Sequence, residues 1–133
     1  MKADPADIIR PVDVDVVWDD LLPVVADLCA MSDDTEPDDV LKACREQRAF
    51  FYTVEGGGGF AIIKPIVHPK SGEVGMFVWF GQNWTVDRDL WNACLDVAAR
   101  QLGATYIEFS SRRRGFERTG WQPVATTYRR EVA

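Results

Sequence analysis

One connection in this chain is long enough to join two parallel strands, and it lies in the second half of the sequence. Residues 74–80 form the most apolar run, and residues 104–110 alternate in the manner of another strand. Between them, residues 87–102 carry apolar side chains at helical spacing, namely Leu90, Cys94, Val97, Ala98 and Leu102. Because a helical crossover returns the chain in its original direction, we expect the two strands to lie parallel in one sheet.

The other apolar runs predict further strands and helices. Strands are expected at residues 8–12, 49–54, 60–67 and from residue 124 onward, and helices at residues 14–31 and 38–47. Pro23 interrupts the first helical stripe, so that helix either kinks or restarts behind Asp19 and Asp20. Gly56 to Gly59 separate two strands. They favour a hairpin turn over a phosphate-binding loop, because a strand and not a helix follows them.

These elements predict an α/β (α+β) fold with a mixed central sheet of about six strands and helices on both faces. Consecutive strands form antiparallel hairpins, whereas the helix at 87–102 makes the one parallel crossover. The run at 74–80 should be central and covered on both faces, because it is so apolar. At 133 residues the chain has the size of one domain, so we expect a single domain spanning residues 1–133.

The charge and composition exclude several classes of protein. The net charge is −6 at pH 7, which argues against nucleic-acid binding, since phosphate binding needs an extended basic surface. No run approaches the roughly 18 apolar residues of a membrane span, and no export signal is recognisable, so we expect a soluble, cytoplasmic protein without membrane partners. Cys29, Cys44 and Cys94 lack metal-ligand spacing, which predicts reduced thiols and no metal site.

The order of elements, together with three short motifs, resembles the GNAT (Gcn5-related N-acetyltransferase) superfamily. The motifs are Ile9-Arg10-Pro11 at the first strand, Leu102-Gly103-Ala104 at a helix exit, and the segment Phe116-Glu117-Arg118-Thr119-Gly120-Trp121. The wording Arg-Arg-Gly-aromatic-Glu-Arg, at residues 113–118, is most similar to GNAT-like proteins encoded in bacteriophage and prophage genomes. The resemblance implies the GNAT fold and an N-acetyltransferase that uses acetyl-CoA or another acyl-CoA and an amine substrate.

The resemblance also implies which residues hold the cofactor. Backbone groups of the strand at 74–80 would grip the pantetheine arm, and the loop opening the next helix would present N–H groups to the pyrophosphate. The implied cofactor-binding residues are Phe80, Gly81, Gln82, Asn83, Trp84, Thr85 and Arg88. This loop departs from the family pattern Arg/Gln-x-x-Gly-x-Gly/Ala. It contains the bulky Trp84, and Asp87 and Asp89 place negative charge at the helix start, which repels a pyrophosphate.

The implied catalytic residues also depart from the family. The tyrosine that protonates the departing thiolate in many members is Phe116 here, and Tyr128 is the stand-in candidate acid. Glu108 is the candidate general base, because Tyr106, Glu108 and Ser110 share one face of a strand. An ion pair with a neighbouring arginine is the alternative role for Glu108, and the pattern favours it.

A second function class therefore stays open: a non-catalytic, phage-encoded GNAT-like module that acts in virion assembly or binds a host or viral protein. Trp84 and Trp91, together with the arginines at 112, 113 and 114, would form its contact surface for a protein partner or a second copy of the chain. The alternative for Arg112, Arg113 and Arg114 is a solvated run that neutralises the acidic first half of the chain.

Overall fold

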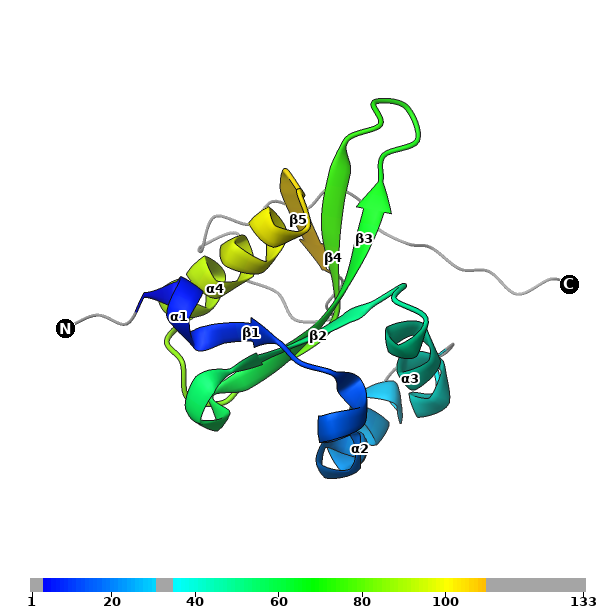
Figure 1. Ribbon diagram of the computed structural model, residues 1–133, viewed down its shortest axis with the longest axis vertical. Coiled ribbons are helices and arrows are strands. Elements are labelled where there is room, and N and C mark those ends of the chain that lie inside the picture. The colour runs from blue at the N-terminus through cyan, green and yellow to red at the C-terminus, as the bar shows by residue number, and fades with distance from the viewer. Residues whose placement is uncertain (1–3, 31–34, 110–133) are drawn as a thin grey trace, which may run out of the picture.

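The computed structural model describes residues 4–30 and 35–109, which form one mixed sheet with helices on both faces (Figure 1). Its strands are β1 (Ile9–Pro11), β2 (Phe50–Val54), β3 (Gly59–Val67), β4 (Val74–Asn83) and β5 (Tyr106–Phe109), and its helices are α1 (Pro5–Ile8), α2 (Val14–Ala30), α3 (Pro37–Arg45) and α4 (Arg88–Gln101), with a 3₁₀ turn at Glu55–Gly57. The five strands lie in chain order across the sheet. The expected fold class is confirmed, and the final strand predicted from residue 124 lies outside the described residues.

The strands β2, β3 and β4 form an antiparallel meander. The turn between β2 and β3 uses Gly56 and Gly57 at φ of 74° and 70°, values that glycine adopts without strain. In the turn between β3 and β4, the Nδ1 atom of His68 accepts hydrogen bonds from the backbone N–H groups of Lys70 and Ser71. The predicted glycine hairpin is therefore confirmed.

The strands β4 and β5 are parallel, joined by the crossover helix α4, as predicted. The prediction that residues 74–80 are covered on both faces holds in part. Met76 and Val78 pack in the core under α4, and Trp79 and Phe80 pack in the core under α2 and α3, but most side chains of this run are only half-buried. Within β4 only Gly75 and Met76 are buried, whereas β3 is buried from Gly59 through Ile63 and lies in the middle of the described sheet. Apolarity alone did not distinguish these two strands, because the β4 run also carries half-exposed aromatic side chains.

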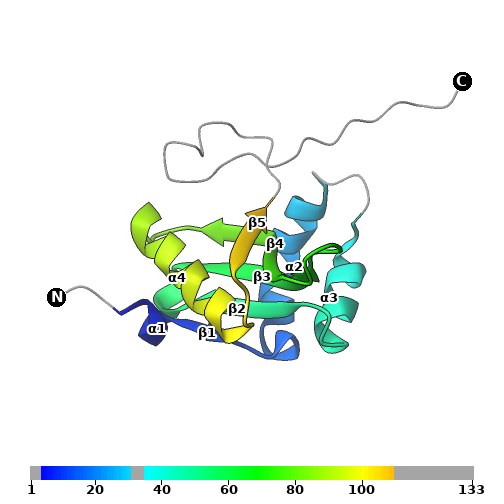
Figure 2. The same ribbon diagram turned by 90° about the horizontal axis from the view of Figure 1, so that it is seen from above.

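Two apolar cores lie on opposite faces of the sheet (Figure 2). On one face, α1 and α4 cover Ala61, Ile63 and Met76. On the other face, α2 and α3 cover Phe51, Phe60 and Ile62. Successive residues of a strand point to opposite faces, so the strand sequence assigns each side chain to one of the two cores.

The ends of the helices follow from local sequence. The carboxylate of Asp87 accepts a hydrogen bond from the N–H of Leu90 at 2.9 Å and caps the start of α4. Pro37 occupies the first turn of α3, where a proline costs no helical hydrogen bond. The helix α2 does not restart behind Asp19 and Asp20. It runs through Pro23 as one helix, and Pro23 lies on its exposed side.

Candidate functional site

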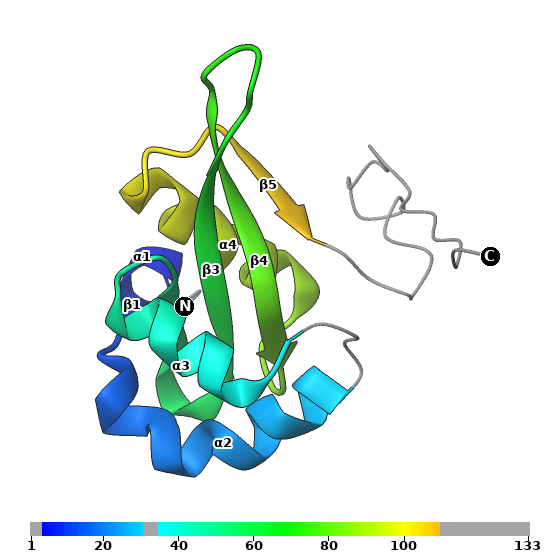
Figure 3. The same cartoon turned by 90° about the vertical axis from the view of Figure 1, so that its right-hand side faces the viewer.

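Among residues 4–30 and 35–109, the strand β4 has a partner on both edges over its first half. Its pairing with β3 extends to Asn83, whereas its described pairing with β5 runs from Gly75 opposite Tyr106 to Val78 opposite Phe109. Figure 3 shows β5 beside β4, and all four residues of β5 pair with the first half of β4. We call the remaining part of β4, Trp79 to Asn83, the open edge. The sequence predicted that the loop begins at Gly81. In the structure β4 continues to Asn83, and residues 84–87 connect β4 to α4.

Two local features set the geometry of the open edge. The register with β3 shifts between Ile62 and Ile63, which are paired with Phe80 and Val78, so Trp79 is the extra residue of a bulge. Further along, the N–H of Trp84 donates to the carbonyl oxygen of Gly58 at 2.9 Å. The two-residue alternation of an antiparallel ladder then directs the N–H and C=O of Gly81 away from β3, toward the β5 side. This part of the chain offers backbone hydrogen-bonding groups to an extended ligand.

The parallel pair is held close at its beginning by a missing side chain. A Cβ atom at Gly75 would lie 2.3 Å from the ring of Tyr106, so only glycine lets the tyrosine ring cover β4 at this point. At the same end of the pair, the hydroxyl of Thr105 donates to the carboxylate of Glu73. The two strands are therefore held close together at this end of the pair.

The candidate base Glu108 lies on β5, half-buried and opposite Phe77. It shares a strand face with Tyr106, as predicted from the two-residue period. Burial raises the pKa of Tyr106, and the carboxylates of Glu108 and Glu73 raise it further. Tyr106 is therefore protonated at neutral pH and available as a hydrogen-bond donor. The sequence did not predict Tyr106 as a hydrogen-bond donor at this site.

The loop at residues 84–87 uses its own amides internally. The N–H groups of Trp84 and Thr85 both donate to the carbonyl oxygen of Gly58, at 2.9 and 3.2 Å. The N–H of Val86 donates to the side chain of Asn83 at 2.9 Å, and that side chain donates back to the carbonyl oxygen of Val86. In this conformation all three amides have acceptors within the protein, including those of Trp84 and Thr85, which the resemblance assigns to the pyrophosphate.

The two tryptophans proposed as one contact surface lie on opposite sides of the sheet. Trp84 is 46% exposed and its ring lies 5.6 Å from that of Phe60, which belongs to the core under α2 and α3. Trp91 is half-buried in the core under α4, and its ring lies where a Cβ atom at Gly59 or Gly81 would contact it, at 3.2 and 3.6 Å. The structure does not bring Trp84 and Trp91 together.

Several predicted site residues fall outside the described part of the chain. They are Arg112, Arg113 and Arg114 of the predicted contact surface, Tyr128 as the candidate acid, and Phe116 at the position of the family's tyrosine. Arg88 is described: it is exposed in the first turn of α4, between Asp87 and Asp89. Gln82 and Phe80 are half-buried in β4.

Sequence reasoning also missed a cation–aromatic contact on the face that Glu108 shares. The ammonium of Lys64 lies 3.4 Å from the centre of the Trp79 ring, and the Trp79 and Phe80 rings are 5.4 Å apart. The sequence signal for this contact was the position of Lys64, which ends the apolar run of β3. This cluster lies next to the bulge, at the point where the open edge of β4 begins.

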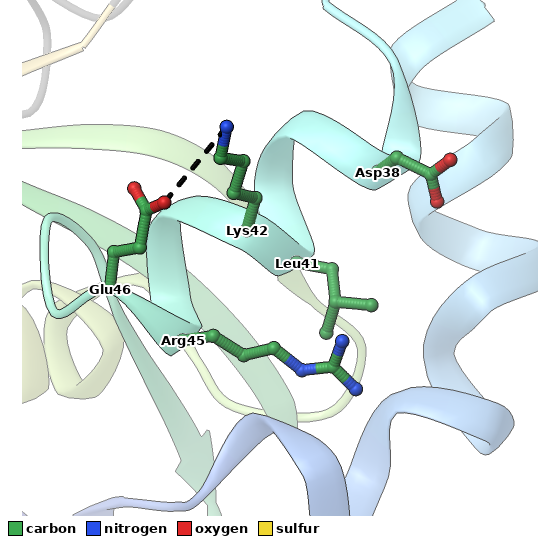
Figure 4. Close-up of a pocket in the computed structure, with 5 residues that line it drawn as sticks. All are labelled: Asp38, Leu41, Lys42, Arg45 and Glu46. Carbon is green, nitrogen blue, oxygen red and sulfur yellow. Dashed lines mark ion pairs between the residues drawn. The ribbon is translucent and has the colours of Figure 1, made fainter.

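The surface hollows of the described residues lie elsewhere. One of about 410 Å³ lies on α3 and is lined by Asp38, Leu41, Lys42, Arg45 and Glu46; in it Lys42 and Glu46 form an ion pair at 4.0 Å (Figure 4). Another of about 510 Å³ lies where α2, α3 and β2 meet, beside the ion pair of Arg45 with Asp15. Neither is lined by residues of β4 or β5. Both contain exposed ion pairs, Lys42 with Glu46 and Arg45 with Asp15.

Residues 4–30 and 35–109 contain no group of three or more histidine, cysteine, aspartate or glutamate side chains placed to hold a metal ion. Within the same ranges, no helix combines the length and apolarity that crossing a membrane requires.

No family model matches the chain, and no curated protein matches it in sequence. Solved structures do match it. A ribosomal-protein-alanine N-acetyltransferase from Brucella melitensis biovar Abortus 2308 superposes with a TM-score of 0.64 at 14% identity, covering 93% of this chain and 99% of that one. A GNAT family acetyltransferase from Staphylococcus aureus has a TM-score of 0.62 at 12% identity, covering 94% and 98%.

A third structure is an aminoglycoside acetyltransferase from an uncultured soil metagenomic sample, in complex with sisomicin. Its TM-score is 0.62 at 8% identity, and the match covers 94% of this chain and 95% of that one. At such identities the likeness concerns the fold alone. The chain has the fold of GNAT acetyltransferases.

Proposed function

We propose that the chain binds an acyl thioester along the open edge of β4 and transfers its acyl group to an amine, as an N-acyltransferase. One observation carries this proposal: β4 is fastened to β5 as far as Val78 and continues to Asn83 with peptide groups directed toward the β5 side. An extended ligand with amide groups, such as a pantetheine arm, hydrogen-bonds to an open strand edge in the way an added strand does.

The two parts of coenzyme A fit this site differently. The pantetheine arm fits the open edge, because its amides match the spacing of strand peptide groups. The diphosphate does not fit the loop at 84–87, because three of the loop amides have internal acceptors and Asp87 and Asp89 are negatively charged. The proposal therefore concerns the thioester arm, and no step of it depends on the diphosphate.

Glu108 is the proposed base of this reaction. An amine attacks a thioester only when it is neutral, so a group near the thioester must accept the proton of the ammonium form. Glu108 lies on the strand that borders the open edge, beside the neutral hydroxyl of Tyr106. Tyr128 remains the proposed acid for the departing thiolate.

Titration calorimetry with acetyl-CoA at low salt tests the proposal, together with thermal unfolding at millimolar ligand. Binding to the folded state must raise the melting temperature by mass action. We expect both heat and stabilisation. We further expect Glu108→Gln to retain thioester binding while slowing transfer to an acceptor amine by roughly 10²-fold or more, measured as thiol release. A protein that shows neither heat nor stabilisation contradicts the enzyme proposal.

A second candidate is a non-catalytic module of the phage-encoded type, which binds a virion component, a host or viral protein, or a second copy of itself. The internally bonded loop and the exposed ring of Trp84 favour it. The replacement Trp84→Ala should then shift a concentration-dependent monomer–dimer equilibrium by about 1 kcal/mol or more. Trp91→Ala is unsuitable as an interface probe, because that ring belongs to a core. A chain that sediments as a monomer at all concentrations excludes self-association.

A further inference from the structure

The loop between β4 and α4 is built against the hairpin between β2 and β3. The carbonyl oxygen of Gly58 accepts two hydrogen bonds from this loop, from the N–H groups of Trp84 and Thr85. Two converging N–H groups at the start of a helix are the arrangement that binds a phosphate oxygen in many proteins. Here a backbone oxygen of the same chain occupies that position as the acceptor.

Packing makes this contact a fixed part of the fold. A Cβ atom at Gly58 would lie 2.8 Å from a γ-carbon of Val86 and 3.2 Å from the hydroxyl of Thr85. A Cβ atom at the next residue, Gly59, would lie 2.5 Å from the carbonyl oxygen of Gln82. Both glycines are buried, Gly58 in van der Waals contact with the loop and Gly59 with the end of β4 that precedes it. The loop amides cannot turn toward a ligand without separating the two segments.

Side chains close the rest of the loop. The amide of Asn83 holds both the N–H and the C=O of Val86. The carboxylate of Asp87 takes the N–H of Leu90, and Asp89 adds a second negative charge in the first turn of α4, with Arg88 as the one base among these three residues. Helix starts favour anions, and here the negative charges of the protein itself already occupy that position.

We infer that the ligand of this site is a pantetheine thioester recognised without a nucleotide anchor, and that Gly58, Asn83 and Asp87 are the residues that exclude a diphosphate from the loop. This inference rests on the proposed function, because it describes the same open edge of β4. The proposed ligand is an acyl group on a pantetheine arm whose far end extends into solvent past α4.

The test compares three ligands by titration calorimetry: acetyl-CoA, S-acetyl-pantetheine and adenosine 3′,5′-bisphosphate. We expect acetyl-CoA and S-acetyl-pantetheine to bind within about threefold of one another, with little change between 50 and 300 mM salt, because no phosphate contact contributes. The bisphosphate alone should give no heat. If acetyl-CoA binds more than about tenfold tighter than S-acetyl-pantetheine, the inference is overturned while the proposed function stands. If neither thioester binds, both are overturned.

A matched pair of variants locates the effect. Asp87→Asn removes one negative charge while keeping an oxygen that caps the helix, and Asp96→Asn removes the same charge from an exposed position further along α4. Because Asp87 is proposed to exclude a diphosphate, we expect Asp87→Asn to bind acetyl-CoA severalfold more tightly than the parent protein, while Asp96→Asn stays within about twofold and S-acetyl-pantetheine is unaffected by either change. An unchanged affinity of Asp87→Asn for acetyl-CoA, or an equal rise for S-acetyl-pantetheine, overturns the part that the inference assigns to Asp87.

Discussion

The glycine turn at residues 55–58 and the loop at residues 84–87 lie side by side and obtain their shapes by different means. The turn depends on backbone freedom, with Gly56 and Gly57 at positive φ. None of the four loop residues has a positive φ; the loop is shaped by the side chain of Asn83 and by the carbonyl oxygen of Gly58. Glycine therefore gives the turn its backbone shape. The loop, which follows the open edge of β4, contains no glycine and is held by hydrogen bonds.

This comparison is tested most strongly at Gly59. The change Gly59→Ala puts a methyl group 2.5 Å from the backbone oxygen of Gln82 and should lower the free energy of unfolding by about 3 kcal/mol, since rigid backbone must move. Gly56→Ala meets open space and should cost only about 1 kcal/mol, from its positive φ of 74°. Urea denaturation of both variants measures the difference. Equal losses indicate that the start of β3 and the end of β4 are not in close contact.

The two tryptophans extend the comparison from backbone to side chains. Trp91→Ala removes a ring that packs beneath both segments, and we expect a loss of about 2–3 kcal/mol in unfolding free energy. Trp84→Ala removes a half-exposed ring that contacts Phe60, and should cost about 1 kcal/mol. Thermal and urea unfolding can rank them. The reverse order contradicts the assignment of Trp91 to the core and Trp84 to the surface.

A smaller effect is expected at Asn83. Its replacement by alanine deletes two exposed hydrogen bonds to Val86 and should cost about 1 kcal/mol, while hydrogen exchange of the Val86 amide accelerates. The control is Asn92→Ala in α4, which should change stability by less than about 0.5 kcal/mol. Unchanged exchange at Val86 in the Asn83 variant indicates that the loop keeps its shape without this side chain.

The thiol of Cys44, in α3, should make the unfolding free energy depend on pH without involving the turn or the loop. Burial raises the pKa of its thiol from 9.0 to about 11. The unfolded chain loses this proton first, so the contribution to stability is complete below pH 9 and is lost between about pH 9 and 11. Allowing for partial exposure, the loss is about 1 kcal/mol. The difference in unfolding free energy between the parent and Cys44→Ala should shrink by that amount over this range, and a constant difference refutes it.

The parts of the fold that local pattern determines were predictable from the sequence. The helical period of residues 87–102 and the two strands around it were enough to predict the parallel pair. The helix α1 was missed, because its four residues, Pro5–Ile8, are too few to show a period. The strand β4 was expected to end before Gly81, since glycine and asparagine weaken strand patterns, yet pairing with β3 carries it to Asn83.

The candidate site was less predictable, because its decisive contacts are tertiary. The sequence shows that the loop lacks glycines and carries Asp87 and Asp89. It does not show that the oxygen of Gly58, some 26 residues away in the chain, accepts the loop amides. The sequence also does not show on which side of the sheet Trp84 and Trp91 lie. Trp84 follows a strand end and Trp91 lies near a helix start, where residue spacing alone does not give the direction of a side chain.

The order of strands across the sheet has a consequence for how the molecule folds. The meander of β2, β3 and β4 is joined by two short turns, so its pairings close small loops, whereas β1 joins β2, and β5 joins β4, only after intervening helices. Small loops lose less chain entropy on closing. We expect the meander to form first and β5 to dock late. The strand that carries Glu108 would then be protected from hydrogen exchange after the meander, and β1, whose connection to β2 is the longer one, would be protected last.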